Sequence, residues 1–150
     1  CQHLVVCRGV NCAVMHTKLP LNAIVWGIGA VLPVMEAQGS GQIINLGSIG
    51  ALSVVPTGAV YCASKFAVRA ISDGLRQESS KIRVTCVNPG VVESELASTI
   101  THVETMKAMD AYRSVALQPA DIARAVRHII ESPESVDTTE ITIRPTASAN

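Results

Sequence analysis

The stretch from Gln42 to Lys65 constrains the fold of this 150-residue chain more than any other part of the sequence. It opens with a short apolar run, Gln42–Leu46, that ends at Gly47 and predicts a buried strand. A loop containing proline and glycine follows, and residues 59–77 then carry a long helical pattern with no internal proline. A buried strand that leads into a long helix indicates an α/β fold built on a parallel sheet.

Three side chains in this stretch form a candidate catalytic group. Tyr61 and Lys65 are four residues apart near the start of the helix, so they lie on one helix face. Ser48 follows the strand at its C-terminal end, where open α/β sheets place their ligands. We expect the Lys65 ammonium to lower the pKa of the phenol from about 10 towards the range useful for proton transfer. Ser48 can then hydrogen-bond a substrate oxygen and hold it against the phenol.

The bare Tyr-x-x-x-Lys pattern also occurs in ordinary amphipathic helices, but the serine thirteen residues upstream favours the catalytic interpretation. Together, Asn45-Leu-Gly-Ser48 and Tyr61-Cys-Ala-Ser-Lys65 resemble the active-site signature of the short-chain dehydrogenases/reductases. The resemblance implies a Rossmann-type three-layer fold and an NAD(P)-dependent oxidoreductase. Such an enzyme transfers hydride between a nicotinamide and a small alcohol or carbonyl substrate, with Tyr61 as the general acid/base and Lys65 holding the nicotinamide ribose.

A second motif, Val87–Ser94, looks like the Pro-Gly cofactor loop of the same family. The resemblance implies that backbone groups near Val92 meet the nicotinamide carboxamide and that the Ser94 hydroxyl supports this contact. A glycine allows a close approach of backbone to ligand, which is the physical use of Gly90. The cofactor residues implied by the resemblance are Tyr61, Lys65, Pro89, Gly90, Val92 and Ser94.

A further helix is predicted over Leu21–Gln38, ending at the Gly39–Gly41 turn, and its widely distributed apolar residues predict that it is largely buried. Near its start, Asn22 stands close to the position of a fourth catalytic residue in the family, an asparagine that holds a water in the proton relay. The alternative is that Asn22 is simply the N-cap of this helix.

The rest of the chain predicts regular elements in an α/β order. Arg83–Asn88 predicts the next parallel strand, residues 121–131 a helix introduced by Pro119, and residues 140–144 a final strand. Residues 98–112 form, in the family, the lobe that covers the substrate. The C-terminal runs 117–123 and 143–148 are similar to bacterial members that oxidise small 3-hydroxy acids, serine among them, with NADP.

Residues 1–21 are atypical for such a domain. Leu4–Cys7 predicts a strand followed by a loop, and Val6-Cys7-Arg8 stand where the family has Asn-Asn-Ala. The chain contains no glycine-rich turn, with strand and helix around it, to hold a pyrophosphate. We therefore expect one partial Rossmann-type domain over residues 1–150, lacking the first βαβαβ half. A catalytically inactive fragment that serves only as a helix-mediated assembly module is the alternative.

Composition narrows the classes of partner. Basic and acidic residues balance at twelve each, so nothing attracts nucleic acid or an anionic membrane surface in general. The five cysteines form no spaced framework, which favours free thiols and the cytoplasm. We expect no metal site, because Cys1, His3, Cys7, Cys12 and His16 lack the spacing of zinc ligands. Family members pair through the two long helices, so a homo-oligomer is expected, with neither nucleic acid nor membrane as a partner.

Overall fold

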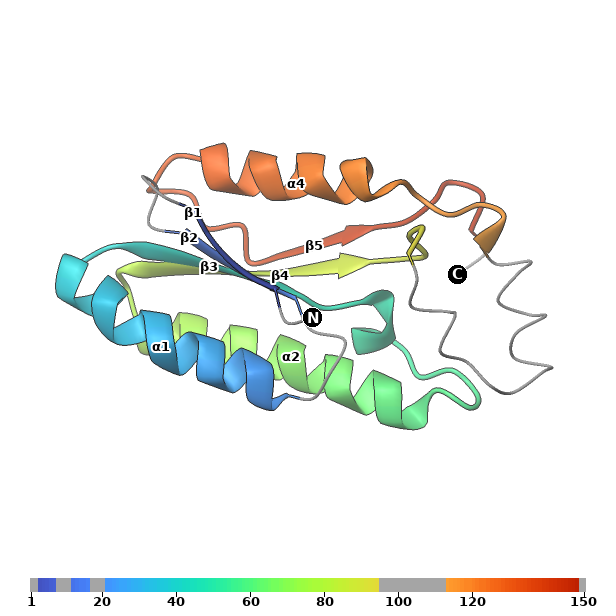
Figure 1. Cartoon of the computed structure of the whole chain (residues 1–150), viewed down its shortest axis with the longest axis horizontal. Coiled ribbons are helices and arrows are strands. Elements are labelled where there is room, and N and C mark those ends of the chain that lie inside the picture. The colour runs from blue at the N-terminus through green and yellow to red at the C-terminus, as the bar shows by residue number, and fades with distance from the viewer. Residues whose placement is uncertain (1–2, 8–11, 17–20, 95–112, 149–150) are drawn as a thin grey trace.

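The computed structural model describes residues 3–7, 12–16, 21–94 and 113–148, in which five strands form one sheet between two layers of helix (Figure 1). Helices α1 and α2 cover one face of the sheet and α4 covers the other. The elements are β1 (His3–Cys7), β2 (Cys12–His16), α1 (Asn22–Gln38), β3 (Gly41–Leu46), η1 (Ile49–Ala51), α2 (Ala59–Glu78), β4 (Ile82–Pro89), α4 (Pro119–Glu131) and β5 (Glu140–Ile143).

The sheet has the order β1-β2-β3-β4-β5, and strands β2 to β5 are parallel. The predicted α/β architecture is confirmed for this part. One expectation for the N-terminal segment is wrong: residues 12–16 form a strand rather than a loop, and this strand pairs antiparallel with β1. The parallel neighbour of β3 is therefore Cys12–His16 and not Leu4–Cys7. The reason is geometric, since two strands this close in sequence can pair only as a hairpin, whereas parallel pairing needs a long crossover.

Two separate clusters of apolar side chains hold the layers together. Successive residues of a strand point to opposite faces, so Ile43 packs with the α1 and α2 side chains while its neighbour Ile44 packs with α4. Both isoleucines are completely buried. On β4 the same alternation places Val84 in the first cluster and Val87 in the second. The central strands β3 and β4 are thus covered on both faces, as parallel strands require.

Helix α1 has nearly the predicted bounds, and Gly39 ends it with a left-handed φ of 75° that favours glycine. The expectation that α1 is largely buried is wrong. Only Ile24, Ile28 and Met35 are buried, whereas Trp26 is 68% exposed. A single helix face can meet the sheet at one time, so apolar residues on the other sides of α1 have no cover within the described part of the chain.

The remaining predicted elements agree with the structure to within a few residues. Helix α2 runs one residue beyond its predicted end, and α4 begins at Pro119, where Gln118 and Asp121 cap each other's backbone. The predicted substrate lobe, 98–112, lies outside the described residues. Among the helices that the structure describes, none is long and apolar enough to cross a membrane.

Candidate functional site

Ser48 lies just beyond the C-terminal end of β3, at the position predicted from the sequence. The ladder of β3 and β4 ends where the Gly47 amide donates to the carbonyl of Val87, at 2.7 Å. The chain then turns into η1, and Ser48 caps this short helix by accepting a hydrogen bond from the Gly50 amide, at 3.1 Å. The serine hydroxyl therefore has a defined position at the edge of the sheet where ligands bind in α/β folds.

Tyr61 stands in the first turn of α2 and faces η1. A Cβ added at Gly50 would lie 3.0 Å from Cε1 of the Tyr61 ring, so the glycine allows the loop to pack directly against the phenol. The side chain of Tyr61 is nevertheless 44% exposed. Its phenol is therefore both supported by the protein and open to a molecule arriving from solvent.

Lys65 lies one turn further along α2 and is buried. Its ammonium donates to the carbonyl of Leu46 at 3.2 Å, and Nζ is 5.9 Å from the centroid of the Tyr61 ring. Burial lowers the pKa of Lys65. An ammonium has more donors than this one bond uses, so Lys65 retains hydrogen-bonding capacity for a ligand.

The direction of the Tyr61 pKa corrects one expectation. The pKa of Tyr61 is raised above 10, chiefly because burial disfavours the phenolate, while a hydrogen bond with the Ser48 side chain acts in the opposite direction. Lys65 is not among the groups that lower it. The ammonium points to the Leu46 carbonyl and its Nζ lies 5.9 Å from the centroid of the Tyr61 ring. The raised pKa favours the neutral phenol, the form that can donate a proton.

The predicted cofactor loop leaves β4 at Pro89, the last residue of the strand. The Gly90 amide donates to the Ile143 carbonyl at 2.8 Å, and a Cβ added at Gly90 would lie 3.4 Å from Cα of Arg144. The close approach at Gly90 is thus to the end of β5. Further along, Val92 forms a bridge with Leu117. This bridge ties the loop to the segment that leads into α4.

Ser94 is held by its backbone, because the Arg113 guanidinium donates to its carbonyl. The neighbouring Glu93 accepts a hydrogen bond from the Gln118 amide group at 2.8 Å. The loop is thus held by contacts of Glu93 and Ser94 in addition to the bridge at Val92. The roles of Pro89, Gly90, Val92 and Ser94 towards a cofactor remain predictions.

Asn22 is the first residue of α1 and its side chain is exposed. The interpretation of Asn22 as the N-cap is wrong, because Leu21 occupies that position and no side chain caps the helix. A short polar side chain one residue inside the helix is past the point where it can bond the first amides. Its role as a fourth catalytic residue stays a prediction.

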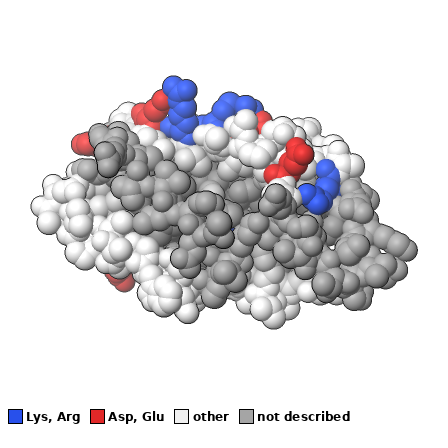
Figure 2. Space-filling model, viewed as in Figure 1, with Lys and Arg blue, Asp and Glu red and all other residues white. Residues whose placement is uncertain are grey.

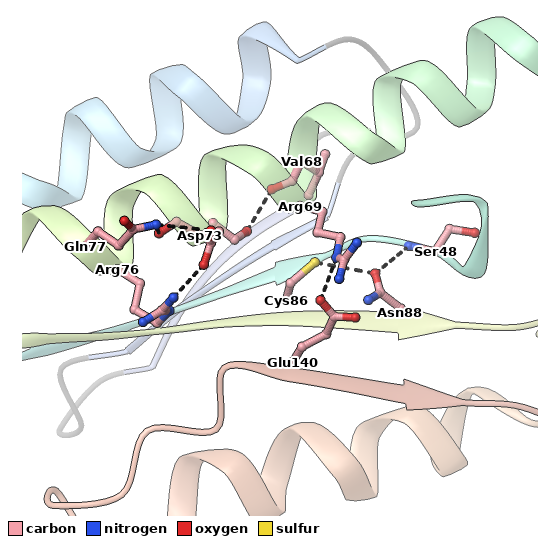
Figure 3. A network of polar contacts seen from close by, with 10 residues as sticks. Ser48, Val68, Arg69, Asp73, Arg76, Gln77, Cys86, Asn88 and Glu140 are labelled. Carbon is pink, nitrogen blue, oxygen red and sulfur yellow. Dashed lines mark hydrogen bonds and ion pairs between the residues drawn. The ribbon is translucent and has the colours of Figure 1, made fainter. Parts of the chain in front are cut away.

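The sequence reasoning missed two buried asparagines that lie behind this group. Asn88, on β4, accepts a hydrogen bond from the Ser48 amide at 3.3 Å (Figure 3). Asn45, on β3, donates to the Ser72 hydroxyl of α2 at 2.9 Å. The sequence signal was a polar residue at an inward position of an otherwise apolar strand. Buried polar side chains are usually hydrogen-bonded, so such a residue indicates a specific partner.

Within the described ranges, no group of three or more histidine, cysteine or acidic side chains could hold a metal ion. The side chains of Cys1, His3, Cys7, Cys12 and His16, considered above as ligands, lie outside what the structure describes. Cys62 and Cys86 are free and buried. Burial raises the pKa of Cys86, so its thiol is protonated at neutral pH.

Comparison with known proteins adds independent information. Residues 13–105 match the family described as short chain dehydrogenase. An uncharacterized oxidoreductase of Staphylococcus saprophyticus is 43% identical over 133 residues, 86% of this chain and 54% of that protein. One of Listeria monocytogenes is 41% identical over 126 residues, 81% of this chain and 51% of its own length. The chain thus spans about half the length of the curated relatives it matches.

Solved structures give the same result for the fold. A serine dehydrogenase in a closed form complexed with NADP+ is 32% identical, with a TM-score of 0.74 over 82% of this chain and 51% of that one. The serine dehydrogenase from Escherichia coli is 30% identical, with a TM-score of 0.66 over 82% of this chain and 48% of its own.

Proposed function

Because the chain belongs to the short-chain dehydrogenase family, we propose that it carries the catalytic part of an NAD(P)-dependent oxidoreductase acting on an alcohol or carbonyl substrate. The observation that carries this proposal is the convergence of Ser48, Tyr61 and Lys65 at the C-terminal end of β3. A hydroxyl, a phenol and an ammonium that share one small volume can bind an oxygen and move a proton to or from it.

Each of the three groups has a separable task. Tyr61 donates its proton to a carbonyl oxygen as the carbon is reduced, and its phenolate takes the hydroxyl proton back when a carbinol is oxidised. Ser48 holds that oxygen within reach of the phenol. Its contact with Tyr61 also favours the phenolate, since it lowers the pKa that burial raises.

Lys65 fits the cofactor side of the site. Its ammonium is buried at the base of the group and has donors beyond the one used by Leu46, which suits the hydroxyls of a ribose. The nicotinamide, when bound, supplies the hydride for reduction or accepts it in oxidation. NADP is the favoured form, since the serine dehydrogenase neighbour was crystallised with NADP+.

The substrate class can be proposed more narrowly. The C-terminal runs of the sequence are similar to members that oxidise small 3-hydroxy acids, and both serine dehydrogenases are at least 30% identical to this chain. We therefore place a small 3-hydroxy acid such as serine first among substrates to be tried. The free thiols of Cys62 and Cys86 favour the cytoplasm as its compartment.

A second candidate function is a non-catalytic assembly module, and a specific observation favours it. Large apolar side chains of α1 and α2, including Trp26 at 68% and Val60 at 87%, are exposed. The raised pKa of Tyr61 also reduces the fraction of phenolate that could accept a proton at neutral pH. A homo-oligomer formed through these helices is compatible with either function.

Titration of NADPH fluorescence with the chain separates the two functions. The oxidoreductase predicts binding that is weaker than micromolar, since this chain contains no glycine-rich turn for the pyrophosphate. Replacing Lys65 by Met should weaken it further, whereas Arg127→Met, on the opposite layer, should leave it unchanged. No binding at millimolar concentrations, in a folded chain, would favour the assembly module. A micromolar or tighter constant, about 8 kcal/mol of binding free energy, would contradict the expectation for residues 1–21.

A further inference from the structure

We propose that Asn88 is a positioning residue for Ser48, an inference that rests on the proposed function and deepens it. Asn88 is completely buried near the C-terminal end of β4, which pairs with β3, the strand that Ser48 follows. Its Oδ1 accepts the hydrogen bond of the Ser48 amide at 3.3 Å, across forty residues of sequence (Figure 3). This bond reaches Ser48 where the regular ladder has already ended, and so fixes the first residue that the sheet itself no longer holds.

Gly47 shows how tightly the loop sits on this amide. A Cβ added at Gly47 would lie 2.3 Å from Oδ1 of Asn88 and 3.0 Å from Sγ of Cys86, and the first distance is far shorter than real contacts allow. Only a residue without a side chain permits the loop to approach so closely. Asn88 and Gly47 therefore act as a pair that determines how closely the Ser48 loop approaches the end of β4.

The orientation of the Asn88 amide follows from its neighbours. Oδ1 lies next to two donors, the Ser48 amide and the Cys86 thiol at 3.4 Å, so the oxygen must occupy this side. Nδ2 is buried and has no hydrogen-bond partner in the described part of the chain. A buried donor without a partner costs stability. A residue that served packing alone would avoid this cost, which points to positioning of the loop as the reason for asparagine here.

The effect of Asn88 passes through Ser48 to the phenol. The Ser48 hydroxyl accepts a hydrogen bond from Gly50 and contacts Tyr61, whose ring rests on Gly50. A shift of the Ser48 backbone therefore moves both the hydroxyl that holds the substrate oxygen and the surface behind the phenol. Displacements of this kind lower the rate of chemistry more than they weaken substrate binding.

The test compares Asn88→Ala and Asn88→Asp with the unaltered chain, using the amide signal of Ser48 in a nitrogen–proton correlation spectrum. Asn88→Ala should move this signal to lower frequency, as expected for an amide that loses its acceptor, and Asn88→Asp should restore most of the shift because it retains an oxygen at the same reach. Thr85→Val is the matched control. Thr85 is a buried polar residue of the same strand whose hydroxyl also lacks a partner among the described residues, but by alternation it faces α4.

A double-mutant cycle makes the test independent of enzymatic activity. Gly47→Ala should lower the midpoint of chemical denaturation strongly in the unaltered chain and much less in the Asn88→Ala background, where the clashing oxygen is absent. Additive effects, or an unmoved Ser48 signal in Asn88→Ala, would overturn the proposal. Should Asn88→Ala fail to fold, Gly47→Ala examines the same contact from the loop side and must shift the Ser48 signal.

Turnover provides the second readout. With NADP+ and a 3-hydroxy acid, Asn88→Ala should lower kcat by roughly 10- to 100-fold with KM nearly unchanged, and Asn88→Asp should recover most of it. An equal rise in KM at constant kcat would contradict the positioning role. If the double-mutant cycle shows coupling between Gly47 and Asn88 but the unaltered chain has no turnover, the contact is supported and the proposed oxidoreductase is contradicted.

Discussion

The outer surfaces of the two helical layers differ in chemical character: one is charged and the other is apolar. The outer side of α4 carries charged side chains that pair along the helix, Arg124 with Asp121 and Arg127 with Glu131. In Figure 2 these charges gather along the side of the molecule where α4 lies. The layer formed by α1 and α2 instead exposes large apolar side chains, namely Val25, Trp26, Val34, Val60 and Phe66.

This difference indicates which layer meets solvent and which is expected to be covered. An amphipathic helix such as α4 is complete once its apolar stripe packs on the sheet. Helices α1 and α2 have apolar residues left over after both have packed on Ile43 and Val84. Exposed apolar patches of this kind mark interaction surfaces. We infer that a second copy of the chain covers the α1–α2 layer, and the variants below are chosen to break or sharpen this contrast.

The largest effects are expected in the two cores themselves. Ile43→Ala and Ile44→Ala remove completely buried side chains that face opposite layers, and each should lower the free energy of unfolding by about 2–5 kcal/mol. Denaturant titration of the single and double variants tests whether the cores are separate. The loss from Ile43→Ala should add to that from Ile129→Ala, whereas Ile44 and Ile129 share one cluster and should not add. Equal coupling of both pairs would contradict the two-core description.

Disruption of the α1–α2 surface should have the next largest effect. Trp26→Glu places a charge in the exposed apolar patch and should weaken self-association by about 30-fold or more, as expected for an aromatic anchor at an interface. Light scattering after size exclusion at micromolar concentration measures it. Arg124→Glu on α4 is the control and should leave the assembly intact. A sharp peak near 15.8 kDa for the unaltered chain would show that no second copy covers this layer.

Tyr61 belongs to the exposed α1–α2 layer, and its ionisation tests how Ser48 and burial set the pKa of the phenol there. Ser48→Ala removes the hydrogen bond that lowers the pKa of Tyr61 and leaves the burial that raises it, so the pKa of Tyr61 should rise further. The phenolate absorbance is followed as the pH increases above about 10, in a Tyr112→Phe background so that only Tyr61 titrates. A titration that moves to lower pH in Ser48→Ala would show that the serine acts on the phenol in the opposite sense.

The smallest effects are expected for surface ion pairs. Arg69→Ala breaks the 2.7 Å pair between α2 and Glu140 of β5 and should reduce the unfolding free energy by at most about 1 kcal/mol, less at high salt. Arg127→Ala breaks a pair within one turn of α4 and should produce no measurable change. Thermal unfolding at low and high ionic strength compares the two. A salt-independent loss in Arg69→Ala would indicate that packing of its side chain, rather than its charge, stabilises α2 against β5.

Much of the fold and the site could be predicted because the information is local. The apolar run before Gly47 defines β3, the proline-free pattern defines α2, and the spacing of Tyr61 and Lys65 places both on one face. What could not be predicted depends on partners distant in sequence. The pKa of Tyr61 is raised because burial of the phenol outweighs its hydrogen bond with the Ser48 side chain, and burial depends on residues far apart in the sequence.

The same holds for the remaining differences. The bond from the Ser48 amide to Asn88 joins two strands, and no spacing rule points to it. The β1–β2 hairpin was missed because its strands are short and lack a diagnostic turn sequence. The exposure of Trp26 depends on which elements cover α1, and a helical pattern does not predict these elements.

The proposed chemistry is tested most directly by the rate of NADP+-dependent oxidation of a 3-hydroxy acid in the unaltered chain and in Tyr61→Phe. The substitution removes only the oxygen that transfers the proton, so turnover should fall by at least about 100-fold while the unfolding midpoint and NADPH affinity stay close to those of the unaltered chain. Phe66→Leu, on the exposed side of the same helix, should retain full turnover. Unchanged turnover in Tyr61→Phe would contradict the assignment of Tyr61 as the general acid/base, and with it the proposed mechanism.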